Sequence, residues 1–104
     1  MSLRRYEILL PIRYNDGSPV EEEKFAQTRR ELVSAFGALT TQPEPMQGWW
    51  THEGSTYEDR SLRLILDVGA TQENRKFLAN FKETLKARFR QLDVWMISYE
   101  IDIH

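Results

Sequence analysis

The chain has 104 residues, of which 40% are hydrophobic and 12% aromatic, and it carries a formal net charge of −2. These values are typical of a globular protein and exclude a disordered chain, so we expect one domain over residues 1–104. The lack of cysteine excludes disulfide frameworks, thiolate zinc sites and cysteine nucleophiles.

The sequence predicts neither a membrane helix nor a secretory signal. No apolar run approaches the roughly 20 residues that a membrane helix needs. The N-terminus lacks the apolar centre of a secretory signal. We therefore expect a cytoplasmic protein that has no membrane partner.

The first predicted elements are a strand and a helix. Apolar and polar residues alternate from Tyr6 to Tyr14, which predicts a strand. Pro11 has no N–H to donate, so we expect either a bulge there or the end of pairing on one side of the strand. Ser18 is the predicted N-cap of a helix, since Pro19 suits the first helical position and Glu21 completes a capping box. Gly37 is the expected end of this helix.

The middle of the chain predicts two strands. The first, over residues 38–52, is interrupted by Pro43-Glu44-Pro45 and resumes near Gly48-Trp49-Trp50, which places it at a sheet edge. Glu53-Gly54-Ser55 predicts a hairpin turn. One face of the returning strand is formed by Leu62, Leu64, Leu66 and Val68.

A second helix and a last strand complete the chain. Thr71 is the predicted cap of the helix. The apolar stripe of this helix comprises Phe77, Leu78, Phe81, Leu85 and Phe89. The last strand is predicted over residues 92–103, and if Trp95 points toward the helices, Val94 and Met96 point away from them.

This order of elements predicts an α+β fold of the ferredoxin-like βαββαβ type. Two right-handed crossovers give a four-stranded antiparallel sheet of spatial order 4-1-3-2, with both helices on one face. Helices on opposite faces would require strands that are apolar on both sides. Glu7, Arg13, Arg63 and Asp67 argue against that alternative.

The sheet face that the helices leave open is a candidate interface. We expect Leu9, Ile65, Val94 and Met96 to form its apolar centre. Monomers seldom expose a large contiguous apolar patch, so we expect a homodimer joined through this face. The alternative is a solvated face on which Glu7 and Arg63 form an ordinary cross-strand ion pair.

The aromatic residues near the hairpin are the next candidates for binding. On a strand, Trp49 and Trp50 point to opposite faces, so one at most packs on the helices, and the other belongs to the hairpin, an interface or a pocket. Tyr57-Glu58-Asp59-Arg60 offers paired carboxylates for acid–base work or a hard cation. Adjacent residues on an extended chain diverge, however, and a turn with a local Asp59–Arg60 or backbone contact is favoured.

Other functional classes find little support. Two histidines without cysteine disfavour a metal site, and no serine has a base and an orienting acid, so we expect no cofactor and name no catalytic residue. The net negative charge of the chain disfavours binding to nucleic acid. Residues 72–90 hold six basic side chains against Glu73 and Glu83. The basic face of the second helix could bind an acidic partner, could pair with the acidic first helix, or could simply be solvated.

The sequence resembles a family of short bacterial proteins, about 100 residues long, that have no assigned function. The shared motifs are Tyr6-Glu7 with Pro11 to Gly17, Phe36-Gly37, Gly48-Trp49-Trp50, Tyr57-Glu58-Asp59 and Phe89-Arg90-Gln91. The resemblance implies a stand-alone ferredoxin-like domain and no catalytic residues.

Two other ferredoxin-like groups provide comparisons. RNA-recognition domains carry base-stacking aromatics on the third strand, and residues 61–66 have none. Dimeric α/β-barrel enzymes of the small-monooxygenase type hold a substrate in a cavity. Such an enzyme, with a pocket near Arg13, Trp49 and Trp50, is the alternative to a non-catalytic binding domain.

Overall fold

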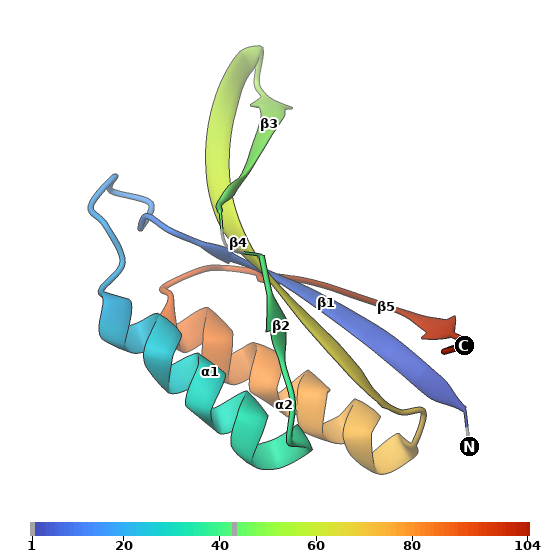
Figure 1. Ribbon diagram of the computed structural model, residues 1–104. Coiled ribbons are helices and arrows are strands. Elements are labelled where there is room, and N and C mark those ends of the chain that lie inside the picture. Colours follow the sequence, from blue (N-terminus) through green and yellow to red (C-terminus); the bar gives the residue numbers. More distant parts are fainter. Residues whose placement is uncertain (1, 43) are drawn as a thin grey trace.

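The computed structural model describes residues 2–42 and 44–104. Its elements in chain order are β1 (Leu3–Pro11), α1 (Glu22–Phe36), β2 (Thr40–Thr41), β3 (Met46–His52), β4 (Ser55–Gly69), α2 (Gln72–Arg88) and β5 (Trp95–Ile101). The sheet is antiparallel, in the order β2-β4-β1-β5, and β3 also pairs with β4. Both helices cover one side of this sheet (Figure 1). The predicted fold class is confirmed, with the second predicted strand divided into β2 and β3.

The core lies between the helices and the inner face of the sheet. Alternate residues of the two central strands point into it, while each helix contributes residues three or four positions apart. The buried members from the strands include Tyr6, Ile8, Leu10, Leu64, Leu66 and Val68. Those from the helices and the turn after α2 include Phe25, Leu32, Leu78, Phe81, Leu85 and Phe89.

One residue of the predicted apolar stripe lies outside the core. Phe77 is 40% exposed, and its ring packs edge-on against Phe36, with 5.3 Å between the ring centroids. The other four stripe residues are buried. Phe77 therefore marks the margin of the helix pair rather than its centre.

The predicted ends of the helices are confirmed in two cases and wrong in one. Gly37 has a left-handed φ of 80° and donates its N–H to the Val33 carbonyl (2.7 Å), and Thr71 Oγ1 accepts from the Asn74 N–H (3.1 Å). Ser18, in contrast, does not cap α1, which begins at Glu22. The Ser18 N–H and hydroxyl donate instead to Asp16 Oδ1.

The reason for the later helix start is the turn after β1. Tyr14 donates its N–H to the Ser18 carbonyl (2.8 Å), and Val20 donates to the Ile12 carbonyl (2.9 Å). The chain therefore folds back on itself through Val20 before any helix forms. The side chains that could cap a helix in this segment stabilise the turn instead, as the hydrogen bonds from Ser18 to Asp16 show.

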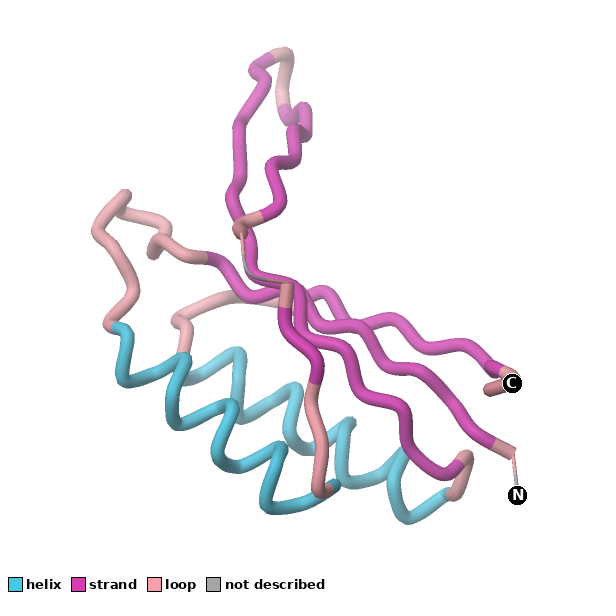
Figure 2. The backbone as a smooth tube through the Cα atoms, viewed as in Figure 1, coloured by secondary structure: helices cyan, strands magenta, loops and turns pink. Residues whose placement is uncertain are grey.

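The 15-residue strand β4 joins two parts of the molecule. Its second half pairs with β1 from Ser61↔Pro11 to Gly69↔Leu3. Pairing of β1 with β4 ends at Pro11, which is the second of the two predicted roles of this residue. Its first half pairs with β3 in a two-stranded ribbon, residues 46–60, that we call the hairpin. The hairpin extends away from the helices and the body of the sheet (Figure 2). The prediction of a strand break at Pro43 falls outside the described residues.

Within residues 2–42 and 44–104, neither α1 nor α2 is both long and apolar enough to span a bilayer.

The two predicted caps provide a matched pair of substitutions. Thr71→Ala removes the hydroxyl that satisfies the Asn74 N–H, so we expect a loss of about 1 kcal/mol in the free energy of unfolding. Ser18→Ala removes only an exposed turn contact, and we expect a change within about 0.5 kcal/mol. Urea unfolding followed by circular dichroism measures both, and equal losses would contradict the assignment.

Candidate interface on the open sheet face and the hairpin

The open face of the sheet is formed by alternate residues of three strands. In the strand register, Leu9 of β1 lies between Arg63 of β4 and Trp95 of β5. Two residues earlier on β1, Glu7 lies between Ile65 and Ile97. Each of these side chains points away from the helices. The central residues of this face are Arg5, Glu7, Leu9, Arg63, Ile65, Asp67, Trp95, Ile97 and Tyr99.

The charged residues of this face neutralise one another. Arg63 Nε donates to Glu7 Oε1 (2.6 Å), and the Tyr99 hydroxyl donates to the other oxygen of Glu7. Arg5 holds Asp67 through two bonds, of 2.7 Å to Oδ1 and 2.9 Å to Oδ2. Two guanidinium groups thus match two carboxylates, and Glu7 is only 8% exposed although it faces away from the core.

The same contacts fix the protonation states of these groups. The hydrogen bond from Tyr99 and the ion pair with Arg63 lower the pKa of Glu7, despite the desolvation that opposes ionisation. The Arg5 guanidinium lowers the pKa of Asp67, and Glu7 raises the pKa of Tyr99. Both carboxylates are therefore ionised and the phenol protonated at neutral pH. Such a network orients and neutralises charge, and it has no general base with a raised pKa.

The orientation of β5 corrects the predicted open face. Val94 is 2% exposed and Met96 packs against the core, whereas Trp95 is 63% exposed. The predicted placement of Val94 and Met96 on the open face is wrong, because pairing with β1 sets the parity of the strand. Trp95 and Ile97 take their places on the open face, with Ile97 39% exposed.

The side of β5 that faces the helices includes a polar residue. Ser98 is partly buried there, and Arg4 of β1 donates to its hydroxyl (2.9 Å) and to its carbonyl (3.3 Å). This face is therefore less apolar than the outward one. The larger hydrophobic residues of β5 point to solvent, which is the reverse of what side-chain hydrophobicity alone predicts.

The hairpin exposes its aromatic residues on both sides. Trp50 stacks on Tyr57 across the two strands, with ring centroids 4.6 Å apart and an interplanar angle of 23°. Trp49 points to the opposite side of the ribbon beside Glu58 and is 63% exposed. Neither tryptophan enters the core, which agrees with the prediction that at most one of them packs on the helices, and Trp50 packs within the hairpin instead.

Polar contacts hold the side of the hairpin that carries Trp49. Gln47 Nε2 donates to Glu58 Oε1 (2.6 Å), and the Arg60 Nε lies 3.6 Å from the same oxygen. The expected Asp59–Arg60 contact is replaced by this Glu58–Arg60 pair. Glu58 and Asp59 point to opposite sides of the ribbon, as expected for adjacent strand residues.

A concavity of about 1150 Å³ lies between the hairpin, the segment after β1 and the start of β5. Six of the predicted binding residues contribute to its wall: Leu9, Arg13, Trp49, Trp50, Tyr57 and Asp59. Trp95, whose inward orientation was the condition for placing Val94 and Met96 on the open face, also contributes. Ile65 lies farther along the open face, and Met96 is turned away. The concavity is open to solvent, since Trp50 and Tyr57 are 48% and 44% exposed.

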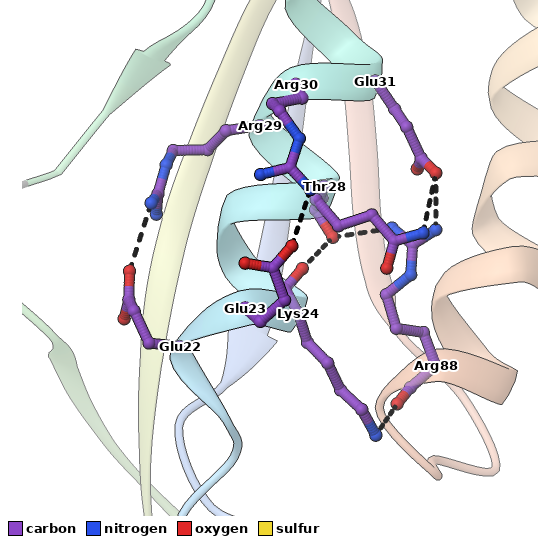
Figure 3. A network of polar contacts seen from close by, with 9 residues as sticks. Glu22, Glu23, Lys24, Thr28, Arg29, Arg30, Glu31 and Arg88 are labelled. Atoms are coloured by element: carbon purple, nitrogen blue, oxygen red, sulfur yellow. Dashed lines mark hydrogen bonds and ion pairs between the residues drawn. The ribbon is translucent and has the colours of Figure 1, made fainter.

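The basic residues of α2 are largely engaged within the chain. Arg88 donates to Thr28 Oγ1 (2.9 Å) and Glu31 Oε1 (2.8 Å), and Lys24 donates to the Arg88 carbonyl (2.8 Å), which joins the two helices (Figure 3). The other ion pairs of this helix are Lys82–Asp93 (3.0 Å) and Lys86–Glu83 (3.2 Å). Pairing with the first helix, one of the three predicted roles, is thus confirmed for Arg88.

His52 lies beside Glu53 on the hairpin, with 3.7 Å between its Nε2 and the nearer carboxylate oxygen, and both side chains are mostly exposed. Among residues 2–42 and 44–104, no group of three or more His, Asp or Glu side chains is placed to hold a metal ion.

Comparisons with solved structures identify similar folds. The chain resembles the CutA1 protein of Oryza sativa (14% identity, TM-score 0.68, covering 100% of this chain and 84% of that chain) and the divalent cation tolerance protein of Thermus thermophilus (17%, 0.66, 98% and 86%). It also resembles a phage SAM lyase solved with S-methyl-5′-thioadenosine (15%, 0.62, 97% and 90%). At these identities the likeness shows the fold alone.

No protein-family model and no curated protein matches the sequence. The resemblance to a family of short bacterial proteins therefore stays a prediction. The solved structures show a small ferredoxin-like α+β domain, as the order of elements predicted.

The Glu7 network predicts a pH-dependent stability difference. Because the pKa of Glu7 is lowered in the folded chain, its contribution is present above the ordinary glutamate pKa and is lost as the pH falls through the folded pKa. We expect Glu7→Gln to lower the free energy of unfolding by about 1–3 kcal/mol near neutral pH. Urea unfolding of both proteins should show this gap narrowing in acid. A gap that stays constant down to about pH 3 would contradict the ionic role of Glu7.

Proposed function

We propose that this chain is a non-catalytic binding and assembly domain of the cytoplasm that acts as a homodimer, joined through the open sheet faces of two copies. The observation that carries the proposal is the exposure of Trp95 and Ile97 beside a set of internally neutralised charges. Large apolar side chains that lie together on a surface mark sites of interaction.

The paired charges make this face suitable for burial. Removing an unpaired charge from water is strongly unfavourable, but each carboxylate here already has its cation and its hydrogen bonds. A partner that covers the face therefore does not need to supply a compensating charge. The aromatic residues and arginines on this face are also the types enriched in the centres of protein interfaces.

A second copy is the simplest partner for such a face. A two-fold symmetric contact places the same surface on both sides, so a neutral, apolar surface is complementary to itself. The fold also leaves this face uncovered, because both helices lie on the other side (Figure 1).

The enzyme alternative has one observation in its favour. The concavity near Arg13, Trp49 and Trp50 lies where a pocket was predicted. It is open rather than enclosed, whereas sites for small molecules bury most of their ligand. Arg13 donates to the Gly17 carbonyl (3.1 Å) within its own turn. The binding domain is therefore the better-supported function.

Light scattering tests the assembly. We expect a mass of twice the chain's 12.3 kDa at micromolar concentration, and we expect Ile97→Glu to reduce it to that of one chain, because a carboxylate would be buried at the centre of the contact. Val33→Glu, at an exposed apolar position of α1, is the matched control and should leave the mass unchanged. A wild-type mass of 12.3 kDa would overturn the proposal.

A further inference from the structure

The hairpin shares a continuous surface with the open sheet face. Because β4 runs without interruption from Ser55 to Gly69, its alternate residues Tyr57 and Ile65 lie on the same side of the ribbon. Trp50 stacks on Tyr57 and therefore lies on this side as well. Trp49 lies on the other side. One side of the hairpin is thus an extension of the proposed interface, and the other is not.

The hairpin contacts too little of its own chain to be stable by itself. All residues from 46 to 60 are exposed. An isolated two-stranded hairpin is marginally stable at best in water, and a stacked aromatic pair adds only about 0.5–1.5 kcal/mol. Fixing the backbone costs about 1–2 kcal/mol for each residue. A partner that covers the aromatic residues would provide the missing stabilisation.

The charge of the hairpin restricts the kind of partner. It carries Glu53, Glu58 and Asp59 against the single cation Arg60. This acidic balance opposes the phosphates of nucleic acid and of anionic lipid, although exposed aromatic rings suit both. A protein surface with a neutral, apolar centre fits better, and the open face of a second copy has that character.

The direction of the hairpin relates it to the same second copy. It projects on the side of the sheet away from α1 and α2 (Figures 1 and 2). The concavity at its base is lined both by Trp50 and Tyr57 of the hairpin and by Leu9 and Trp95 of the open face. A molecule seated on the open face near Trp95 therefore meets the hairpin as a side wall.

We propose that the hairpin is an arm that packs its Trp50–Tyr57 side against a second copy of this chain, so that each copy in the assembly is held by the hairpin of the other. This inference rests on the proposed homodimer. It adds a second contact, and it assigns a role to the aromatic residues that the core does not use.

The two sides of the hairpin provide the first test. The double variant Trp50→Ser/Tyr57→Ser should raise the dissociation constant of the assembly by about tenfold or more, since buried aromatic anchors commonly contribute over 1 kcal/mol each. The double variant Thr51→Ala/Thr56→Ala changes a cross-strand pair on the opposite side of the ribbon that does not line the concavity. It is the matched control and should leave the dissociation constant nearly unchanged. Dilution series followed by light scattering measure both. Equal effects of the two variants would overturn the side-specific contact.

A second test detects the arm without changing its aromatic residues. The chain has no cysteine, so Ser55→Cys places a single nitroxide label at the tip of the hairpin. Labelled protein is mixed with an equal amount of ¹⁵N-enriched, unlabelled chain, and only contacts between copies can then broaden the ¹⁵N signals. We expect broadening at Leu9, Trp95 and Ile97. A label at Ser34→Cys, on the exposed side of α1, should leave these signals sharp.

The outcomes separate the two proposals. A monomeric wild-type mass would overturn both the homodimer and the arm. A dimeric mass that is sensitive to Ile97→Glu, together with sharp signals at Leu9, Trp95 and Ile97, would overturn the arm alone. Broadening from the hairpin label together with a specific effect of Trp50→Ser/Tyr57→Ser would support the arm.

Discussion

The packing of one sheet face on two helices is the constraint from which the other features follow. Ile8, Leu10, Leu32 and Leu85 are fully buried between these layers, and β1, β5 and the second half of β4 must present their inner sides to the helices. Because side chains alternate along a strand, the residues on the other side are necessarily turned to solvent. The open face is thus a consequence of the core, and its composition shows what else it is suited to contact.

The charged residues on that open face form ion pairs with one another. Glu7 is held by Arg63 and Tyr99, and Asp67 by Arg5, so their lowered pKa values reflect stable ion pairs and not a proton poised for transfer. An acid–base catalyst requires a group whose pKa lies near the working pH. The arrangement on this sheet favours a surface that can be buried over a surface that performs chemistry.

The similarity to CutA1 proteins and to a phage SAM lyase shows that a shared fold does not identify a function. Proteins with such different names share the same two-helix sheet with this chain at 14–17% identity. A common architecture of this kind accommodates unrelated sites on its loops and faces. The functional argument for this chain therefore depends on its own residues: the open face, the neutralised charges and the exposed aromatic hairpin.

Periodicity and local capping signals in the sequence determined the fold. The alternation in residues 62–68, the helical stripe before Phe89, and the ends at Gly37 and Thr71 are all local patterns, and the structure confirms them. Tertiary structure alone decided which side of β5 faces the helices, because the more apolar side, with Trp95, Ile97 and Tyr99, points outward and only the register with β1 sets this orientation. It also decided that the hairpin projects as a free ribbon. No local pattern shows that β4 continues past the end of its partner β1, so the exposure of Trp49 and Trp50 follows from strand pairing and not from their neighbours in sequence.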